Sequence, residues 1–502
     1  MGIKALLSKP LAAYTHRRNQ AWLQHPEKAQ FEIFRHIITR ATGTAFGKDH
    51  AFAKVKTHAD YVQAVPVRDY EGLANYFNRV KKGEANVLWP GKPLYLAKTS
   101  GTTSGTKYIP ITRDSISNHI NGAKDALLNY IYETGNSAFL DGKLMFLSGS
   151  PALEEIGDIK TGRLSGISNH HVPPYLRTNQ LPSYRTNCLE DWEMKLDKII
   201  DETLNQRMTL ISGIPPWVQM YFDRIVARTG KPIKDVFPDF SLFVYGGVNF
   251  EPYRAKLFQT IGKPVNSIEL FPASEGFFAY QNVQHDPGLL LLLHSGIFYE
   301  FIPAAEYFNP NPTYLTIGQV ETGVNYALVV SSNAGLWRYS LGDTVKFTSL
   351  HPYKLVVSGR IKHFISAFGE HVIGEEVEQA LRRTMVHYTE VEVVEFTVAP
   401  YVTTGAGQSR HEWLIEFARM PDNLAAFENE LNAQLRQLNT YYDDLIAGNI
   451  LSGLKIQALP PQAFQQYMKS LGKLGGQNKV PRLSNDRVIA DALLALPDVR
   501  TD

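Results

Sequence analysis

The most chemically suggestive stretch of the sequence is TSGTTSG, residues 99 to 105, which is followed after one residue by Lys107. Glycine lets backbone N–H groups approach an anion closely, while hydroxyl groups and a lysine add donors and positive charge. The stretch differs from a Walker loop because only three residues separate Gly101 from Gly105, and because the flanking apolar runs favour a hairpin. It is either a phosphate-binding loop or an ordinary Gly/Ser/Thr-rich turn.

Four further stretches follow it in a fixed order: VYGGVNFEPYRAKLF, ELFPASEGFFAYQ, LWRYSLGDTVKF and GRIKHFISAFGEHVIGEEVEQAL. The first ends a predicted strand in two glycines. A flat base can lie against such a main chain at the carboxyl end of a strand, where α/β sheets bind ligands. The other stretches supply carboxylates, arginines and a histidine next to further turns.

The elements that position these stretches alternate between strands and helices. From residue 93 short apolar runs such as KLMFLSG, MTLISG and SLFVYGG alternate with helical segments, which is the α/β signature. Before them, residues 27–43 have helical periodicity. After Arg360 two strands accompany each helix, which predicts a smaller α+β domain. We therefore expect a large domain over residues 1–359 and a small one over 360–502.

Composition narrows the class of protein. The chain has 502 residues, a formal charge of +2 and 44% hydrophobic residues, which is typical of a globular protein of two or more domains and not of one that coats nucleic acid. The single cysteine, Cys188, excludes an intrachain disulfide framework. The longest aliphatic run, 289–293, is too short to span a membrane and is interpreted as a buried strand. We expect a cytoplasmic protein without an export or lipid signal.

Taken in order, these motifs resemble those of the acyl-activating superfamily of adenylate-forming enzymes. More closely, TSGTTSGTKYIP, ASEGFF, RYSLGD and the late GQNKVPR resemble the Gretchen Hagen three family of acyl-acid amido synthetases, from about Phe46 to Arg482. The resemblance implies a large multi-sheet adenylation domain followed by a smaller mobile domain. It also implies ATP and magnesium as cofactors, with a carboxylic acid and an amine or amino acid as substrates.

The resemblance implies nucleotide-binding roles for residues at the matching positions. Six would hold the ATP phosphates, with an ordinary turn as the alternative: Ser100, Gly101, Thr102, Thr103, Ser104 and Lys107. Six more would line the nucleotide: Tyr245, Gly246, Gly247, Ala273, Ser274 and Phe368. For Phe368 core packing is the alternative.

Three charged residues have implied roles beside the phosphates and ribose. Glu275 would bind magnesium, because a hard cation prefers anionic oxygen ligands, and a salt bridge is the alternative. Asp343 would accept both ribose hydroxyls, or else is a turn aspartate. Arg360, at a hinge over residues 359–362, would contact the ribose or the α-phosphate, or else lies on the surface.

The catalytic cation of the small domain has three candidates. His371 in FGEHV stands where related enzymes often have a lysine, and Lys473 and Lys479 lie near the C-terminus. Lys479 matches the family's motif best, so we predict that it completes the adenylation site, with solvated surface charge as the alternative. The acyl pocket is predicted between the helix after the loop and residues 212–218. His119, Trp217 and Val218 are its expected lining residues, with core packing as the alternative for Trp217.

These roles together predict a two-step reaction. A carboxylate attacks the α-phosphorus of ATP to form an acyl-adenylate, and an amine then displaces AMP to form an amide. Two other functions stay open: acyl-CoA ligation, which shares the first step, and nucleotide sensing without turnover. The sequence does not identify the acid, the amine or the oligomeric state.

Overall fold

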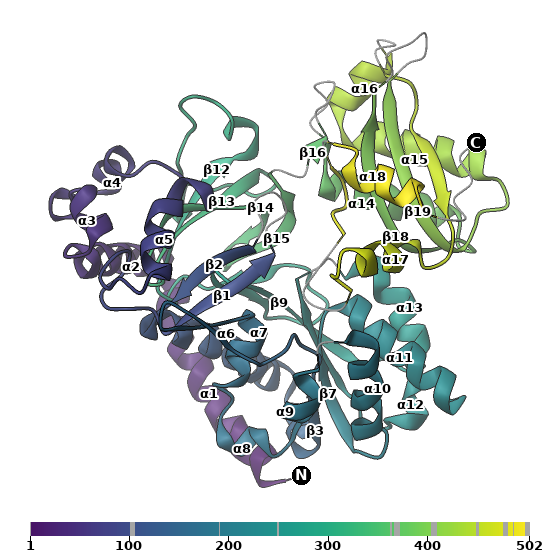
Figure 1. Cartoon of the computed structure of the whole chain (residues 1–502), viewed down its shortest axis with the longest axis horizontal. Coiled ribbons are helices and arrows are strands. Elements are labelled where there is room, and N and C mark those ends of the chain that lie inside the picture. The colour runs from purple at the N-terminus through teal and green to yellow at the C-terminus, as the bar shows by residue number, and fades with distance from the viewer. Residues whose placement is uncertain are drawn as a thin grey trace. The chain divides into compact units, whose positions relative to one another are not determined.

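The computed structural model describes residues 2–100, 106–189, 191–247, 250–361, 364–365, 372–402, 409–447, 451–474, 480–484 and 486–496. The chain forms two compact units (Figure 1). The first comprises residues 1–250, 254–341 and 345–356, and the second comprises 251–253, 342–344 and 357–502. The architecture is mixed α/β in the first unit and α+β in the second, as predicted.

A large sheet forms the centre of the first unit. Within the described chain its eleven strands have the order β12-β13-β14-β15-β11-β10-β9-β8-β7-β3-β6. Its parallel part comprises β6 (Gln180–Leu181), β3 (Lys143–Phe146), β7 (Met208–Ser212), β8 (Leu242–Gly246) and β9 (Asn266–Ala273). The carboxyl ends of parallel strands meet at one edge, so the motifs after β8 and β9 lie where α/β sheets bind ligands.

The rest of this sheet begins with the antiparallel pairing of β9 and β10. The strands concerned are β10 (Gly276–Gln281), β11 (Leu289–Leu291), β12 (Ile297–Pro303), β13 (Asn325–Ser332), β14 (Leu336–Leu350) and β15 (Tyr353–Arg360). All three residues of β11 are buried, which confirms the strand predicted for the aliphatic run at 289–293.

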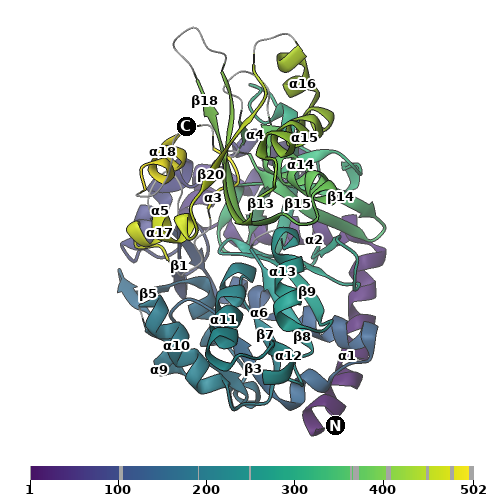
Figure 2. The same cartoon turned by 90° about the vertical axis from the view of Figure 1, so that its right-hand side faces the viewer.

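Helices cover both sides of the parallel strands. Figures 1 and 2 show α1 (Ile3–Gln24) and α6 (Arg113–Thr134) on one side, and α10 (Trp192–Thr203), α11 (Pro215–Thr229) and α12 (Ile233–Val236) on the other. The ends of α6 are set by local chemistry. Thr112 and Ser115 form a reciprocal capping box at its start, and Gly135 ends it with φ +69°.

The strands on either side of the hydroxyl-rich stretch belong to a second, smaller sheet. Among the described residues this sheet has the order β2-β1-β5-β4 and consists of β1 (Tyr95–Ser100), β2 (Thr106–Ile111), β5 (Ile159–Gly162) and β4 (Glu154–Ile156). β1 and β2 are antiparallel, and Ser100 pairs with Thr106. The stretch therefore connects a hairpin, as its flanking apolar runs predict, and does not open a helix.

Short helices surround these sheets. They are α2 (Pro26–Ala41), α3 (Ala45–Asp49), α4 (His58–Ala64), α5 (Ala74–Lys81), α7 (Leu164–Asn169), α8 (Pro174–Arg177), α9 (Tyr184–Asn187) and α13 (Glu251–Ile261). The helix predicted from residue 27 is α2, and Phe34, Ile37 and Ile38 are buried on it. Phe31 is 53% exposed, so it lies outside the buried stripe that its spacing predicts.

The second unit packs its helices on a small sheet. Its described strands have the order β18 (Glu392–Tyr401), β19 (Arg410–Arg419), β20 (Lys455–Leu459), and a separate pair is β16 (Phe364–Ile365) with β17 (Val372–Ile373). Its helices are α14 (Gly374–His387), α15 (Leu424–Leu438), α16 (Thr440–Ala447), α17 (Ala463–Ser470) and α18 (Val488–Leu494). Its core centres on Phe396, Trp413 and Phe427, which are at most 1% exposed. Throughout the described chain, every helix is too short or too polar to cross a bilayer.

Candidate active site

The predicted phosphate loop begins at the end of the β1–β2 hairpin. Ser100 is the last residue of β1, whereas Gly101, Thr102, Thr103 and Ser104 lie outside the described residues, so their roles stay predictions. Lys107 is described on β2, opposite Thr99. Its ammonium nitrogen lies 5.7 Å from the centroid of the Tyr70 ring, which is a cation–π distance.

Glu275 lies at the tip of a tight turn. β9 and β10 are joined by Ser274 and Glu275 alone, because Ala273 pairs directly with Gly276. Gly276 packs closely on the core, since a Cβ atom there would lie 2.6 Å from the terminal methyl of Ile297 and that side chain would have to shift. This close packing fixes the turn on the core and presents Glu275 at the carboxyl end of the parallel strands.

A buried tyrosine connects Glu275 with the hairpin. Tyr339 on β14 is 1% exposed, and burial raises its pKa well above the usual value. The carboxylates of Glu275 and Asp69 raise this pKa further through their negative charge, and Glu275 also accepts a hydrogen bond from the phenol. Tyr70, the ring that faces Lys107, is close enough to act on the same pKa. Glu275, Asp69, Tyr70 and Lys107 therefore belong to one cluster around Tyr339.

The backbone on either side of Tyr339 is held in place. Arg68 accepts a hydrogen bond from the Ser340 N–H at 2.9 Å and donates its own N–H to the Arg338 carbonyl at 3.1 Å. Arg338 has φ +42°, a conformation that L-residues rarely adopt and that costs about 1–3 kcal/mol. Its guanidinium offsets this cost by donating to both carboxylate oxygens of Glu300, at 3.1 and 3.0 Å.

This arginine is fully enclosed. The side chains of Arg338 and Glu300 are 1% and 0% exposed. Arg338 also donates to the Val65 carbonyl at 2.7 Å and lies 4.0 Å from the centroid of the Tyr314 ring. A buried charge is tolerated when it is paired, and Glu300 pairs with this one, although the Nη2 atom of Arg338 is buried without a hydrogen-bond partner among the described residues. Arg338 thus anchors the segment that carries Tyr339.

The predicted base-binding segment has the expected backbone character. Gly246 ends β8, and a Cβ atom on it would lie 2.4 Å from the Leu270 carbonyl oxygen, so only glycine fits. Gly247 follows with φ +86°, which favours glycine as well. Tyr245 is 3% exposed and donates from its hydroxyl to Glu269 at 3.4 Å. Its ring packs in the core, and the role of the neighbouring main chain in binding a base stays a prediction.

In the second unit the structure pairs two candidate residues with each other. Arg360 at the end of β15 donates from Nε to Oδ1 of Asp343 on β14, at 2.6 Å. The two side chains are 45% and 14% exposed. Gly342 beside them has φ +81°, and its carbonyl accepts the Ile361 N–H at 2.6 Å. A turn glycine and a crossing hydrogen bond therefore hold both side chains on adjacent strands.

The predicted acyl-pocket residues lie on two helices. His119 on α6 is 5% exposed, and burial lowers its pKa to about 4. Trp217 and Val218 on α11 are 5% and 0% exposed, and the Trp217 ring lies 5.0 Å from that of Trp192. Figure 1 shows α6 and α11 on opposite sides of the parallel strands. Trp217 and Val218 are packed in the core, and their role in an acyl pocket stays a prediction.

Several predicted residues fall outside the described part of the chain: Phe368, His371 and Lys479. Lys473 is described and exposed. Within the described ranges no group of three or more histidine, cysteine, aspartate or glutamate residues is suited to hold a metal ion. The magnesium role of Glu275 stays a prediction.

Four residues that link the predicted site residues to one another were not predicted from the sequence. Tyr339 and Arg338 stand in the RYSLGD motif, so the motif itself was a signal for them. Asp69 and Tyr70 stand in VRDY, more than 200 residues from Glu275, and nothing local distinguishes them. Their grouping depends on tertiary pairing between distant segments.

Models of three parts of one family match the chain: the GH3 family N-terminal domain over residues 16–171, the central domain over 290–360 and the C-terminal domain over 375–488. A jasmonoyl–L-amino acid synthetase of Nicotiana attenuata is 22% identical over 394 residues, which cover 64% of this chain and 67% of that protein.

Two solved structures share the fold. A GH3.15 acyl acid amido synthetase superposes with a TM-score of 0.78 at 15% identity and 95% coverage of both chains. A 2-hydroxyisobutyryl-CoA ligase with a bound acyl-adenylate superposes with a TM-score of 0.59 at 13% identity, over 93% of this chain and 90% of the other. The fold is that of adenylate-forming ligases.

Proposed function

Because the chain belongs to the GH3 family, we propose that it joins a carboxylic acid to an amine, with an amino acid as the expected acceptor, through an acyl-adenylate made from ATP. One observation supports the proposal. Glu275, Asp69 and Tyr70 all act on the pKa of the buried Tyr339, and the Tyr70 ring faces Lys107. A carboxylate suited to a metal ion and a cation suited to phosphate thus belong to one cluster beside the hydroxyl-rich hairpin. The jasmonoyl–amino acid synthetase name of a relative supports the same class of reaction.

In the first half-reaction the substrate carboxylate attacks the α-phosphorus of ATP, and the bond from that phosphorus to pyrophosphate breaks. Lys107 and the hairpin hydroxyls would stabilise negative charge on the phosphate oxygens. Magnesium, when bound, would neutralise the polyphosphate, and Glu275 would hold it. Tyr339 keeps its proton at neutral pH and donates to Glu275, so it orients the carboxylate toward its ligand.

In the second half-reaction the amine attacks the acyl carbonyl and AMP leaves. The amine must lose a proton during this step, and a water-excluding site protects the mixed anhydride from hydrolysis. Asp343 would bind the ribose of the nucleotide and Arg360 its α-phosphate, and their mutual salt bridge keeps both side chains in position. A cytoplasmic location stays a prediction from the sequence.

A carboxylic-acid library tests the proposal. The chain is incubated with ATP, magnesium and each acid, and pyrophosphate release is measured. Acids that respond are then paired with amino acids, other amines or coenzyme A, and the products are identified by mass spectrometry. An amide together with AMP is the expected outcome. A thioester would favour the acyl-CoA ligase alternative, and ATP binding without pyrophosphate release for any acid would favour a nucleotide sensor.

Two variants assign the chemistry to residues. Glu275→Gln should abolish pyrophosphate release, whereas Glu32→Gln on the exposed side of α2 should leave it unchanged.

Lys479→Ala should slow adenylation by about 10²-fold and spare amine attack on a supplied acyl-adenylate, because the cation is needed only while the carboxylate approaches the polyphosphate. Lys473→Ala is the matched control and should have little effect. If Lys473→Ala has the larger effect, the assignment to Lys479 is wrong.

A further inference from the structure

Helix α1 presents large apolar side chains to solvent. Five of them are 46% to 77% exposed: Ile3, Leu6, Leu7, Leu11 and Tyr14. Apart from Leu6, which lies beside them, they follow one another at intervals of four, four and three residues, so they share one face of the helix. We call these five residues the apolar stripe. Single exposed apolar residues are ordinary, whereas apolar residues gathered on one face mark an interaction site.

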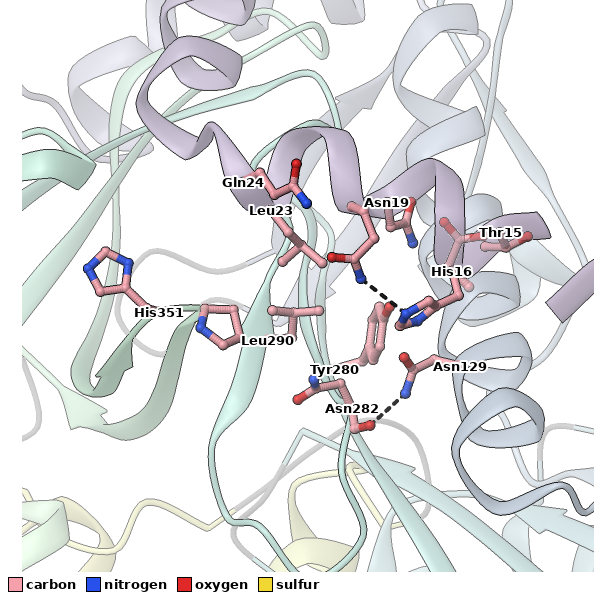
Figure 3. A pocket seen from close by; sticks show the side chains of 13 residues that line it. Thr15, His16, Asn19, Leu23, Gln24, Asn129, Tyr280, Asn282, Leu290 and His351 are labelled. Atoms are coloured by element: carbon pink, nitrogen blue, oxygen red, sulfur yellow. Dashed lines mark hydrogen bonds between the residues drawn. The ribbon is translucent and has the colours of Figure 1, made fainter. Parts of the chain in front are cut away.

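The side of α1 that faces the protein consists mainly of small and polar residues. The buried residues of the helix are Ala5, Ser8, Ala12, Thr15, Asn19 and Trp22. At 3.6 residues per turn, the first five of these lie opposite the apolar stripe. Thr15 and Asn19 line one side of a pocket, and Tyr280 of β10 lines the other (Figure 3). A surface helix ordinarily buries its apolar face. In α1 this order is reversed, so the stripe needs a covering surface that the described part of the chain does not supply.

The charged residues of α1 are all basic. The helix contains Lys4, Lys9, Arg17 and Arg18 and has neither aspartate nor glutamate. Lys9 and Arg17 are exposed. Each stands three residues after a member of the apolar stripe, Leu6 and Tyr14 respectively, and is therefore its neighbour on the helix surface. The border of the stripe thus carries exposed positive charge.

Two carboxylates contact α1 or the residue before it, and both have partners. Asp125 on α6 accepts a hydrogen bond from Arg18 at 2.9 Å, so these two charges match each other. Asp141 accepts the backbone N–H of Gly2 at 2.8 Å, at the start of the helix. With both carboxylates counted, the surface around the stripe stays positive.

The charges decide between two surfaces that could cover the stripe. A second copy of α1 does not complement it, because two helices without a carboxylate set basic residues against basic residues in either direction of pairing. An anionic lipid surface complements both features. Its acyl chains receive the apolar side chains, and its headgroups attract lysine and arginine. The Tyr14 side chain, apolar in its ring and polar at its tip, suits the boundary between the two layers.

We propose that α1 docks the chain on an anionic membrane surface, with the apolar stripe in the headgroup and acyl boundary and Lys9 and Arg17 against the headgroups. The stripe extends over residues 3 to 14, which is about 17 Å at 1.5 Å per residue. The helix would lie in the plane of the interface, so no spanning segment is needed. Docking of this kind does not depend on the reaction proposed above.

Co-sedimentation of the full chain with lipid vesicles tests the proposal. One set of vesicles is phosphatidylcholine alone, and the other is an equal mixture of phosphatidylcholine and phosphatidylserine. At an ionic strength of about 0.01 M we expect binding to the mixed vesicles to be at least about tenfold tighter, and to weaken when the ionic strength is raised to about 0.15 M. Absence of binding to the mixed vesicles, or equal binding to both sets, would overturn the proposal.

Variants locate the binding on α1. Leu7→Asn combined with Leu11→Asn should weaken binding to the mixed vesicles at least about tenfold, because apolar area no longer enters the acyl region. Met194→Asn is the control, since Met194 is 55% exposed on α10, on the other side of the parallel strands. Circular dichroism verifies the fold of each variant.

The charge contribution is measured separately. Lys9→Gln should weaken binding about fivefold at low ionic strength, whereas Lys198→Gln, at a 60% exposed position of α10, should not. If the α1 variants and the two α10 controls bind equally well, the vesicles contact another surface and the proposal is wrong.

Sedimentation velocity without vesicles examines the second copy as the covering surface. We expect the unchanged chain and the Leu7→Asn, Leu11→Asn variant to have the same sedimentation coefficient. An oligomer of the unchanged chain that dissociates in this variant would show that a second copy covers the stripe, and the membrane proposal would then be abandoned.

Discussion

The first and last residues of the RYSLGD motif on β14 each belong to an arginine–carboxylate pair, and the two pairs differ in exposure. Arg338 and Glu300 are 1% and 0% exposed, whereas Arg360 and Asp343 are 45% and 14% exposed. In the enclosed pair the Nε of Arg338 donates to both carboxylate oxygens of Glu300, and the Val65 carbonyl accepts a further hydrogen bond from Arg338. In the open pair the Nε of Arg360 donates to Oδ1 of Asp343 at 2.6 Å.

This difference in exposure indicates a structural role for the enclosed pair and a binding role for the open pair. An enclosed pair cannot exchange partners, because breaking it leaves an unmatched charge in a low-dielectric core. An open pair can give up its contact to a ligand of suitable charge, since water compensates each partner while it is alone. This difference supports a positioning role for Arg338 beside Tyr339 and the proposal that Arg360 and Asp343 contact the nucleotide.

The largest predicted effect is on stability, from Arg338→Met. Removing the cation leaves the buried Glu300 with the His58 imidazole, whose Nε2 lies 2.9 Å from Oε1, in place of a permanent positive charge. This should lower the free energy of unfolding by about 3 kcal/mol. Chemical denaturation measures the change. Arg207→Met, in a pair whose side chains are 57% and 48% exposed, is the control and should change it by less than about 1 kcal/mol. Similar losses in both variants would remove the distinction between enclosed and open pairs.

His119 extends the comparison to an enclosed group without a charge partner. Its folded-state pKa of about 4 lies below the ordinary value of 6.5, so the unfolded chain binds the proton more readily. The contribution of His119 to the free energy of unfolding is therefore fully present above pH 6.5 and is lost as the pH falls toward 4, by about 3 kcal/mol at most. His119→Gln should reduce this acid sensitivity in thermal melts, whereas His25→Gln, at an exposed position, should not. An unchanged pH dependence in His119→Gln would contradict the assignment.

Arg360→Ala should affect chemistry and leave stability nearly unchanged. Loss of a cation at the developing phosphate charge should slow adenylation by about 10²-fold. The free energy of unfolding should change by less than about 1 kcal/mol, because the pair is open. Single-turnover pyrophosphate release and denaturation measure the two quantities. Arg419→Ala, in another exposed pair of the second unit, should alter neither. A marked loss of stability without slower adenylation would make Arg360 structural.

Asp343→Ala should weaken ATP binding by about tenfold while sparing the acid, because its proposed hydrogen bonds are to the ribose. Calorimetric titration with ATP, and separately with the acid, distinguishes the two. Unchanged ATP affinity would return Asp343 to the role of a turn residue.

The smallest predicted effect comes from Tyr339→Phe, which keeps the packing of the ring but removes the hydrogen bond to Glu275. One hydrogen bond to a charged group contributes about 1.5–3 kcal/mol in general. Because Glu275 keeps its charge, we expect a loss near the lower bound, seen as a higher magnesium concentration for half-maximal adenylation. A magnesium dependence equal to that of the unchanged chain would show that Tyr339 does not orient Glu275.

The sequence predicted those features that depend on residues close together in the chain. The hairpin around the hydroxyl-rich stretch, the strand at 289–293 and the glycines after β8 follow from residues within a few positions of each other. The Arg338–Glu300 pair joins positions 38 residues apart, and Asp69 reaches Tyr339 from another part of the chain. The pocket lined by residues such as His16 of α1, Asn129 of α6 and Tyr280 of β10 (Figure 3) likewise needs these distant segments together. Such groupings depend on tertiary packing, which no local pattern encodes.

An isotope-transfer measurement tests the central claim most directly. The acid is supplied with both carboxylate oxygens labelled as ¹⁸O, together with ATP, magnesium and the amine. If the carboxylate attacks the α-phosphorus, one labelled oxygen passes to AMP when the acyl-adenylate is cleaved, and the other stays in the amide. Mass spectrometry should therefore find one ¹⁸O in AMP. Label in inorganic phosphate with formation of ADP, or an amide formed with unlabelled AMP, would contradict the account.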